Sequence, residues 1–469
     1  MNTNMFLRLT KVQHAQLKRH LFPMDGCEAV AIALCGRAVG PKRTGFVVSQ
    51  VYPISYDDCA VRLPERVQWC TQALKPLLQL AARRGMAVVK IHSHPTGRRE
   101  FSEWDDNSDQ SLFDSVYGWM DTLAPHASVI MLPSGELVGR AVFPGGNFET
   151  IGSIDVIGDE IVSWTEPNGE AQADAVSVRT AQAFGRGTIE RLKRLAVAVI
   201  GCSGTGSLVI EQLLHYQVGR LVLVDPDVIE DKNRNRIPYT RPADAHEKRL
   251  KVDVLSDAAS LTGLGTVVEA YARNVIDPDI VRAISECDVI FGCVDSIEGR
   301  HVLNQIATFY LLPYIDVGVR LDANGRGGIE QIVGTVHYLQ PGQSSLFTRG
   351  LYTMEQLRAE GMRRTNPEEY QKLVDEKYIK GVNEDRPAVI SVNMFYASLA
   401  VNELLARLHS YRDDPNSTFA SYCISLTQAL IYRREESELT VDSNLARHTG
   451  RGDCVPLLDR PDLTEGGCQ

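Results

Sequence analysis

The sequence predicts an α/β protein of two domains, an α+β domain followed by a doubly wound one. Its 469 residues are enough for two or three domains of ordinary size. Short β-rich runs such as FVVSQVYPI, AVVKIH and ASVIML crowd the first third. Later in the chain, apolar strand-like runs alternate with helical stretches, which is typical of a parallel sheet covered by helices.

The order of elements places the domain boundary. The first third adds one helix candidate, over 66–85, to its strands. Proline, glycine and acidic residues interrupt the pattern at WTEPNGEAQADA. We therefore expect a domain over 1–165, a linker over 166–176 and a domain over 177–469. In the second domain we expect a helix over 177–195, surface helices over 354–380, and strands at LAVAVIG, RLVLVD, TVVEAY, DVIFGCVD, PYIDVG and QIVGTVHYL.

Composition and charge exclude several classes of protein. A net charge of −10, without a run of five like charges, disfavours nucleic-acid binding through a basic face. No stretch of 18 or more residues is predominantly apolar, so we expect no membrane partner. The N-terminus lacks the apolar core of a signal peptide. The ten cysteines include no C-x-x-C pair, which disfavours a disulfide framework or a cysteine-ligated zinc site. We expect a cytoplasmic protein.

The first candidate site follows strand AVVKIH, where the sequence continues HSHP. Two histidines at i and i+2 on a strand point to the same side, so His92 and His94 can share a metal ion. Asp105 can complete a set of three ligands, which is the arrangement of a catalytic zinc that activates water. Glu28 heads the apolar run EAVAIAL and is a candidate proton shuttle, and Ser102 is a candidate donor to an oxyanion.

The pattern H-x-H-P-x6-S-x-x-D, with the upstream glutamate, resembles the JAB/JAMM metalloprotease family over residues 1–165. That family cleaves peptide or isopeptide bonds after ubiquitin-like tails. One departure is Ala31, where many members have glycine in the helix that contains the glutamate. The resemblance implies that His92, His94 and Asp105 bind zinc. It also implies that Glu28 is the general base and that Ser102 stabilises the oxyanion.

The second candidate site begins where LAVAVIG runs into the glycine-rich segment GCSGTGS. Gly201, Gly204 and Gly206 let the backbone approach a phosphate, and the following helix N-terminus favours negative charge. Such a loop by itself suits NAD or FAD as well as ATP. Asp225 ends the next strand and suits a ribose hydroxyl.

Basic residues after Asp225 favour a nucleoside triphosphate. A cluster of Arg and Lys suits a leaving pyrophosphate, whose charge needs stabilisation. The candidate phosphate-site residues are Asp227, Asn233, Arg236, Lys248 and Lys251. Asp295, at the end of DVIFGCVD, is a candidate magnesium ligand.

These motifs resemble the ThiF/MoeB/ubiquitin-activating-enzyme superfamily over residues 176–340, and PAVISVNMFYASLAVNEL is also similar. That superfamily has a Rossmann-like fold, is usually homodimeric, and uses ATP and magnesium to adenylate the C-terminal glycine of a β-grasp protein. Ser203 replaces a common glycine, which is tolerable if its φ is negative. The resemblance implies that Gly204 and Asp225 contact the adenosine. It implies that Asn233, Arg236 and Lys251 contact the phosphates, with Lys248 as the alternative lysine, and that Asp295 binds magnesium.

The cysteines depart from this superfamily. HYLQPGQSSLFTRG lacks the cysteine pairs that hold a structural zinc in many relatives. No cysteine lies between Cys293 and Cys423, so the usual position of the conjugating thiol is empty. Cys454, in a polar stretch with glycine, is the remaining candidate thiolate.

Together the two resemblances imply a bifunctional enzyme that processes and adenylates a ubiquitin-like protein. The adenylate would serve bacterial-type conjugation or antiviral defence, with a conjugating enzyme as a further partner, or it would activate a sulfur carrier for biosynthesis. Alternatively, the first domain only docks the partner's tail. An NAD-dependent oxidoreductase is disfavoured, because no catalytic acid/base set accompanies the glycine loop.

Overall fold

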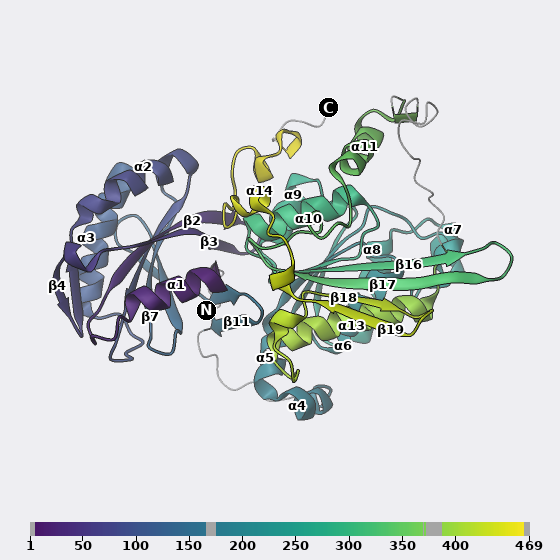
Figure 1. Cartoon of the computed structure of the whole chain (residues 1–469), viewed down its shortest axis with the longest axis horizontal. Coiled ribbons are helices and arrows are strands. Elements are labelled where there is room, and N and C mark those ends of the chain that lie inside the picture. The colour runs from purple at the N-terminus through teal and green to yellow at the C-terminus, as the bar shows by residue number, and fades with distance from the viewer. Residues whose placement is uncertain (1–4, 166–174, 369, 372–386, 464–469) are drawn as a thin grey trace. The chain divides into compact units, whose positions relative to one another are not determined.

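A computed structural model describes residues 5–165, 175–368, 370–371 and 387–463 (Figure 1). The chain forms two compact units. Unit 1 comprises Met1–Gly169, Thr308–Leu311 and Arg447–Gln469, and unit 2 comprises Glu170–Ala307 and Leu312–Ala446. Most of the predicted linker, residues 166–174, lies outside the described residues. In the described part of the chain, no helix is both long and apolar enough to cross a membrane.

Unit 1 is built on a nine-stranded mixed sheet in the order β11-β10-β1-β3-β2-β6-β7-β8-β9. Its strands are β1 Met5–Thr10, β2 Val30–Val39, β3 Thr44–Pro53, β6 Ala87–Ser93, β7 His126–Met131, β8 Leu137–Val142, β9 Phe148–Thr150, β10 Ser153–Ile157 and β11 Ile161–Thr165. The helices are α1 Lys11–Leu21, α2 Lys75–Arg84 and α3 Glu103–Trp119, and β4 Cys59–Leu63 pairs with β5 Arg66–Trp69 in a separate hairpin.

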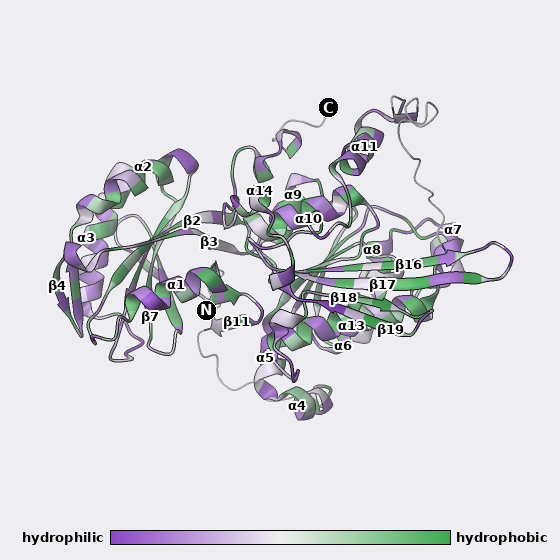
Figure 2. Ribbon diagram, in the orientation of Figure 1, coloured by the Kyte–Doolittle hydropathy of each residue, from purple (hydrophilic) through white to green (hydrophobic). Residues whose placement is uncertain are grey.

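The central strand β2 is buried on both faces of this sheet. Ala31 and Ala33 belong to the core cluster that includes α1, whereas Ile32 and Leu34 belong to the one that includes α2 and α3. A strand covered on both faces is a continuous apolar run, because neither face meets water. The outer helices carry both hydrophilic and hydrophobic residues, as α3 shows in Figure 2.

Double coverage of β2 bears on the position of Ala31. The resemblance to the JAB/JAMM family places Ala31 in a helix with the glutamate, but Ala31 lies in strand β2. A run apolar on every side does not distinguish a buried helix from a buried strand. The helix predicted over 66–85 was also too long, because β5 occupies its first residues and α2 begins only at Lys75.

Unit 2 contains an eight-stranded sheet in the order β14-β13-β12-β15-β16-β17-β18-β19. The first five strands are parallel and the last three antiparallel. The strands are β12 Ala196–Ile200, β13 Arg220–Val224, β14 Val267–Tyr271, β15 Val289–Gly292, β16 Tyr314–Ala323, β17 Ile329–Leu339, β18 Ser421–Ser425 and β19 Leu430–Arg434. The predicted alternation of strands and helices is therefore confirmed.

The helices of unit 2 join or follow these strands. They are α4 Val178–Phe184, α5 Arg186–Arg194, α6 Gly204–His215, α7 Pro242–His246, α8 Lys251–Thr262, α9 Pro278–Ser285, α10 Ile297–Phe309, α11 Met354–Thr365, α13 Ile390–Leu408 and α14 Ser443–Ala446. The helix predicted over 177–195 is divided in two, because Gly185 has a φ of +80°. Of the surface helices expected over 354–380, α11 is described and residues 372–380 lie outside the described residues.

The C-terminal segment packs into unit 1 rather than unit 2. The amide of Gly36 on β2 donates to the carbonyl of Gly450 at 3.1 Å, and the amide of Asp453 donates to the carbonyl of Arg37 at 2.6 Å. The predicted second domain, 177–469, includes this segment. Local sequence contains no signal for this contact, because its partners lie more than 400 positions apart.

Candidate functional site

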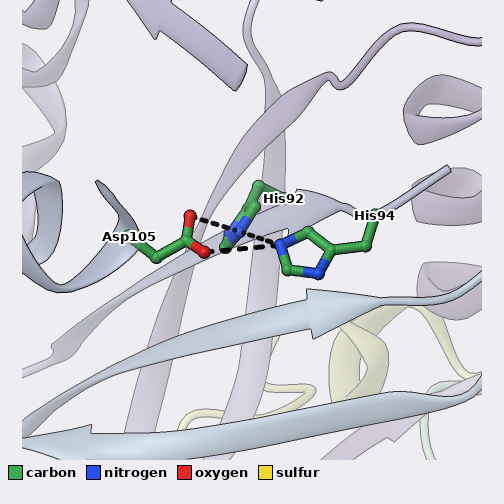
Figure 3. A group of neighbouring side chains, drawn as sticks. All are labelled: His92, His94 and Asp105. Carbon is green, nitrogen blue, oxygen red and sulfur yellow. Dashed lines mark hydrogen bonds and ion pairs between the residues drawn. The ribbon is translucent and has the colours of Figure 1, made fainter. Parts of the chain in front are cut away.

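Strand β6 and helix α3 bring the three predicted metal ligands together (Figure 3). His92 Nε2 lies 3.1 Å from His94 Nε2 and 3.1 Å from Asp105 Oδ1, and His94 Nε2 lies 3.5 Å from Asp105 Oδ2. All three side chains are buried. Elsewhere among the described residues, no three His, Cys, Asp or Glu side chains bring ligand atoms within 4.8 Å of one another.

These distances fit a zinc ion. Zinc bonds nitrogen and oxygen at about 2.0–2.1 Å in a tetrahedron, so its ligand atoms lie roughly 3.3 Å apart. The two nitrogens are 3.1 Å apart here, and they lie 3.1 and 3.5 Å from the two different oxygens of Asp105, which is close to that value. Two imidazole nitrogens facing each other at 3.1 Å need a cation or a proton between them, because their lone pairs repel. The donor set is therefore suited to a metal ion.

Neighbouring groups influence the protonation states of the three predicted ligands. His94 Nδ1 lies 2.8 Å from the carbonyl of Arg98, which favours the tautomer that leaves Nε2 unprotonated. Burial lowers the pKa of His92 and so favours neutral imidazole. Burial also opposes ionisation of Asp105, but His92, His94 and Ser102 together hold its pKa well below its usual range. The carboxylate is therefore ionised, as a ligand must be.

The pairing of β2 with β6 places Glu28 beside this cluster. Val30 lies opposite His92 in the antiparallel register, so Glu28, two residues earlier, reaches the level of His94. Glu28 Oε1 lies 4.0 Å from His94 Nε2. Burial raises the pKa of Glu28 to about 7, which suits a group that exchanges protons near neutral pH.

Ser102 is the N-cap residue of α3. Its hydroxyl accepts from the amide of Asp105 at 3.2 Å and donates to Asp105 Oδ2 at 2.7 Å. The Asp105 carboxylate in turn accepts from the amide of Ser102, which completes a capping box. Ser102 thus fixes the rotamer of a predicted ligand, and its hydroxyl lies next to the cluster.

In unit 2, β12 leads through the glycine loop into α6. Gly201 has a φ of +89°, and a Cβ there would lie 2.6 Å from the carbonyl oxygen of Cys293. A Cβ on Gly206 would lie 1.8 Å from the carbonyl oxygen of Gly201. Both positions therefore require glycine, as a backbone cradle does. Ser203 has a φ of −90°, so the expected condition for replacing glycine is met.

Two polar side chains from distant segments meet at Gly204. A Cβ on Gly204 would lie 2.2 Å from Asn393 Nδ2 and 2.8 Å from Arg236 Cδ. The half-buried Arg236 donates to the carbonyl of Lys232 at 2.7 Å. The sequence analysis did not single out Asn393, a buried amide on the apolar helix α13, because its burial beside Gly204 is visible only in the structure.

Asp225 and Lys251 form the charged part of this site. Asp225 Oδ2 accepts from the amide of Cys202 at 2.7 Å, which ties the carboxylate to the glycine loop. Lys251 Nζ lies 3.5 Å from Asp225 Oδ1 and donates to Asp227 Oδ2 at 2.6 Å. Burial raises the pKa of Asp225, while Lys251 and the backbone amides act in the opposite direction. Lys251 is buried and Lys248 is exposed, which favours Lys251 of the two candidate lysines.

The remaining candidates lie around the same loop. Buried Asn233 accepts from the amide of Glu230 at 3.0 Å and so shapes the turn that leads to Arg236. Asp295 is exposed and follows β15, two residues after the Cys293 carbonyl that packs on Gly201. A position at the carboxyl ends of parallel strands is where α/β sheets bind ligands.

A family model described as ThiF family matches residues 177–438, more than half of the chain. The chain belongs to the ThiF family. The predicted resemblance of unit 2 is thereby confirmed, and its Rossmann-like sheet lies within the matched residues.

Relatives match the chain only in part. The chain is 27% identical over 170 residues to "Ubiquitin-like modifier-activating enzyme 5" of Drosophila mojavensis, which covers 34% of this chain and 40% of the relative. It is 28% identical over 169 residues to the enzyme of that name from Caenorhabditis elegans, which covers 34% and 38%. The chain thus spans about two fifths of the length of these curated relatives.

Solved structures of MccB are also similar. MccB of E. coli with ATP has a TM-score of 0.43 and 19% identity, covering 57% of this chain and 73% of that one. MccB in complex with N-formylated MccA has a TM-score of 0.45 and 17% identity, covering 59% and 76%.

Cys454, the candidate thiolate, lies in unit 1, outside the ThiF region. Its side chain is buried, and its sulfur lies 3.1 Å from the carbonyl oxygen of Pro456. Burial raises the pKa of the Cys454 thiol, which disfavours the thiolate.

Proposed function

We propose that this ThiF-family chain is a bifunctional enzyme acting on a ubiquitin-like β-grasp protein. Unit 1 acts as a JAB/JAMM-type zinc peptidase, and unit 2 adenylates the partner's C-terminal glycine. The observation that carries the proposal is that a ThiF-family chain also places ligand atoms of three buried side chains, His92, His94 and Asp105, within 4.8 Å. Both reactions use the same end of one partner, which is a chemical reason to join them.

In unit 1, the residues that would hold zinc are His92, His94 and Asp105. The ion would supply Lewis acidity and an activated water. Glu28, with its pKa raised to about 7 by burial, takes a proton from water and returns it to the leaving amine. Ser102 stabilises the oxyanion by turning its hydroxyl from Asp105 towards the reacting carbonyl.

In unit 2, the glycine loop cradles ATP, with Gly204 and Asp225 at the adenosine. A carboxylate oxygen of the partner attacks the α-phosphorus, the acyl–phosphate bond forms, and the bond to pyrophosphate breaks. Arg236 and Lys251 stabilise the departing negative charge. Asp295 would hold magnesium, a hard cation that prefers carboxylate oxygen and phosphate. The similarity to enzymes named ubiquitin-like modifier-activating enzyme 5 supports a ubiquitin-like substrate.

Exchange of labelled pyrophosphate into ATP tests adenylation. The full chain is incubated with ATP, magnesium and a β-grasp protein that ends in glycine. We expect exchange that depends on this partner and is lost in Asp295→Ala. Asp231→Ala, which removes an exposed carboxylate on the loop before Arg236, is the matched control and should retain exchange. Absence of exchange, or full exchange by Asp295→Ala, would refute the adenylation half of the proposal.

Zinc content and tail cleavage test the peptidase. We expect one zinc per chain, and cleavage of a β-grasp precursor after its terminal glycine. Glu28→Gln should keep the zinc and lose cleavage, whereas Glu103→Gln, at an exposed position in the first turn of α3, should keep both. A chain without zinc, or unchanged cleavage by Glu28→Gln, would instead support a docking role for unit 1.

We further propose that a cytoplasmic homodimer uses the adenylate in bacterial-type ubiquitin-like conjugation or antiviral defence. The alternative is sulfur-carrier activation for biosynthesis. Cys454 is buried, and the sequence has no cysteine between Cys293 and Cys423, where relatives carry the conjugating thiol. Both observations favour direct use of the adenylate over an enzyme thioester. A thiol-sensitive adduct between the chain and its partner, lost in Cys454→Ala, would establish the thioester route instead.

A further inference from the structure

A buried ion pair lies next to the proposed zinc ligands in unit 1. Lys90 Nζ on β6 donates to Asp109 Oδ1 on α3 at 2.6 Å, and the two side chains are 4% and 0% exposed. Arg140 on β8 lies 2.7 Å from Asp109 Oδ2. Both carboxylate oxygens of Asp109 are therefore bound by cations. The mechanism proposed above does not use any of these three residues.

The spacing of the pair repeats that of the ligands. Lys90 precedes His92 by two residues on β6, so both point to the same face of the sheet. Asp109 follows Asp105 by four residues on α3, so both lie on the same side of the helix. The contacts His92–Asp105 and Lys90–Asp109 are thus two successive bridges between one strand and one helix.

Arg140 extends this arrangement to the loop before α3. Its guanidinium carbon lies 3.8 Å from the ring centroid of Phe101, which directly precedes Ser102. The ring of Phe101 lies 6.2 Å, centroid to centroid, from that of His92. Arg140 also forms an ion pair with Asp106 in the first turn of α3. The network therefore holds α3 at its start and one turn further on.

We propose that Lys90 and Asp109, held by Arg140, are positioning residues that set the register of α3 on β6 and so the distance between Asp105 and His92. The inference rests on the proposed zinc site. The hydrogen bond between Lys90 and Asp109 depends on distance and angle, so a slip or rotation of α3 would break it. Breaking a buried pair leaves an uncompensated charge, whereas replacing both members by apolar residues is often neutral for stability. Apolar contacts are not directional and would not oppose a small rotation.

Zinc affinity of the full chain separates positioning from stability. We would prepare wild type, the double variant Lys90→Met/Asp109→Leu, and Asp109→Asn, which keeps the shape of the side chain but removes its charge. Gln13→Leu removes a buried hydrogen bond of α1 to Val48 in the same unit and controls for general destabilisation. Zinc affinity is measured by competition with a chelator, and the d–d absorption of a Co²⁺-loaded sample reports the ligand geometry. The thermal midpoint of each variant is measured in parallel.

We expect the double variant to melt near the wild type, because Arg140 keeps its ion pair with Asp106, but to bind zinc at least tenfold more weakly, with an altered Co²⁺ spectrum. Asp109→Asn should weaken binding at least threefold, and it decides the question if the double variant does not fold. Gln13→Leu should melt earlier with unchanged zinc affinity. Wild-type affinity and spectrum in the double variant, or wild-type affinity in Asp109→Asn, would overturn the inference while leaving the zinc site intact. A wild-type chain that binds no zinc would overturn both.

Discussion

Gly450 lies where the C-terminal segment crosses strands β2 and β3 of unit 1. Its carbonyl accepts from the amide of Gly36 at 3.1 Å, and its own amide donates to the carbonyl of Thr308 at 3.1 Å. Its φ is +65°, and a Cβ there would lie 2.1 Å from the carbonyl oxygen of Val48. We therefore expect Gly450→Ala to separate the segment from the sheet.

The size of the effect follows from three contributions. A left-handed backbone costs alanine roughly 1–2 kcal/mol. Overlap in a packed site adds about 1–3 kcal/mol, and each weakened backbone hydrogen bond about 0.5–1.5 kcal/mol. Gly26 has a φ of +71°, but a Cβ there would meet nothing within 4 Å. Gly26→Ala therefore carries only the first contribution. The difference of at least about 2 kcal/mol predicts a melting midpoint lower by at least about 4 °C in a unit of this size.

Tryptophan fluorescence isolates the unfolding of unit 1. The chain has four tryptophans, and all lie in this unit: Trp69, Trp104, Trp119 and Trp164. Thermal unfolding of wild type, Gly450→Ala and Gly26→Ala is followed by this signal in the full chain. If Gly450→Ala melts at or above Gly26→Ala, the segment does not stabilise unit 1 and the reasoning is wrong.

Three further predictions concern the two units. Lys251→Met should lower pyrophosphate exchange by about 100-fold or more, because it removes a charge-stabilising group. Lys248→Met, at an exposed position, should keep exchange within about threefold of the wild-type rate. Equal losses in the two variants would contradict the assignment of Lys251. A fragment of residues 1–165 should show no cooperative melting by tryptophan fluorescence, because segments 308–311 and 447–463 are missing from unit 1; a transition like that of the full chain would refute this. In the native protein, iodoacetamide should label buried Cys454 more slowly than exposed Cys70, measured by mass spectrometry. Faster labelling of Cys454 would instead support Cys454 as a reactive thiolate.

Motifs confined to one strand end could be predicted from the sequence. His92 and His94 share a side because a strand repeats every two residues, and Gly201 and Gly206 mark a turn that no side chain fits. The resemblance already preferred Lys251 to Lys248, and the structure adds that only Lys251 is buried.

Contacts between distant segments could not be predicted. Asn393 reaches Gly204 from α13, and Asp109 reaches Lys90 from α3, yet each is locally an ordinary polar residue on a helix. The apolar run after Glu28 shows a similar limit. Such a run does not by itself distinguish a buried helix from a strand covered on both faces, and the covering is decided by other elements.

The sequence by itself predicted the order of strands and helices in the ThiF region, the glycine cradle and the three residues that lie together in the candidate metal site. These depend on repeats and turns within a few neighbouring residues. Only the tertiary structure decided that α3 meets β6 through a buried ion pair and that residues 447–463 complete unit 1. The physical reason is that such contacts depend on which surfaces are buried against each other, and local pattern does not encode that choice. This holds for Lys90 and Asp109, which are 19 positions apart, as well as for the C-terminal segment and β2, which are far apart in the sequence.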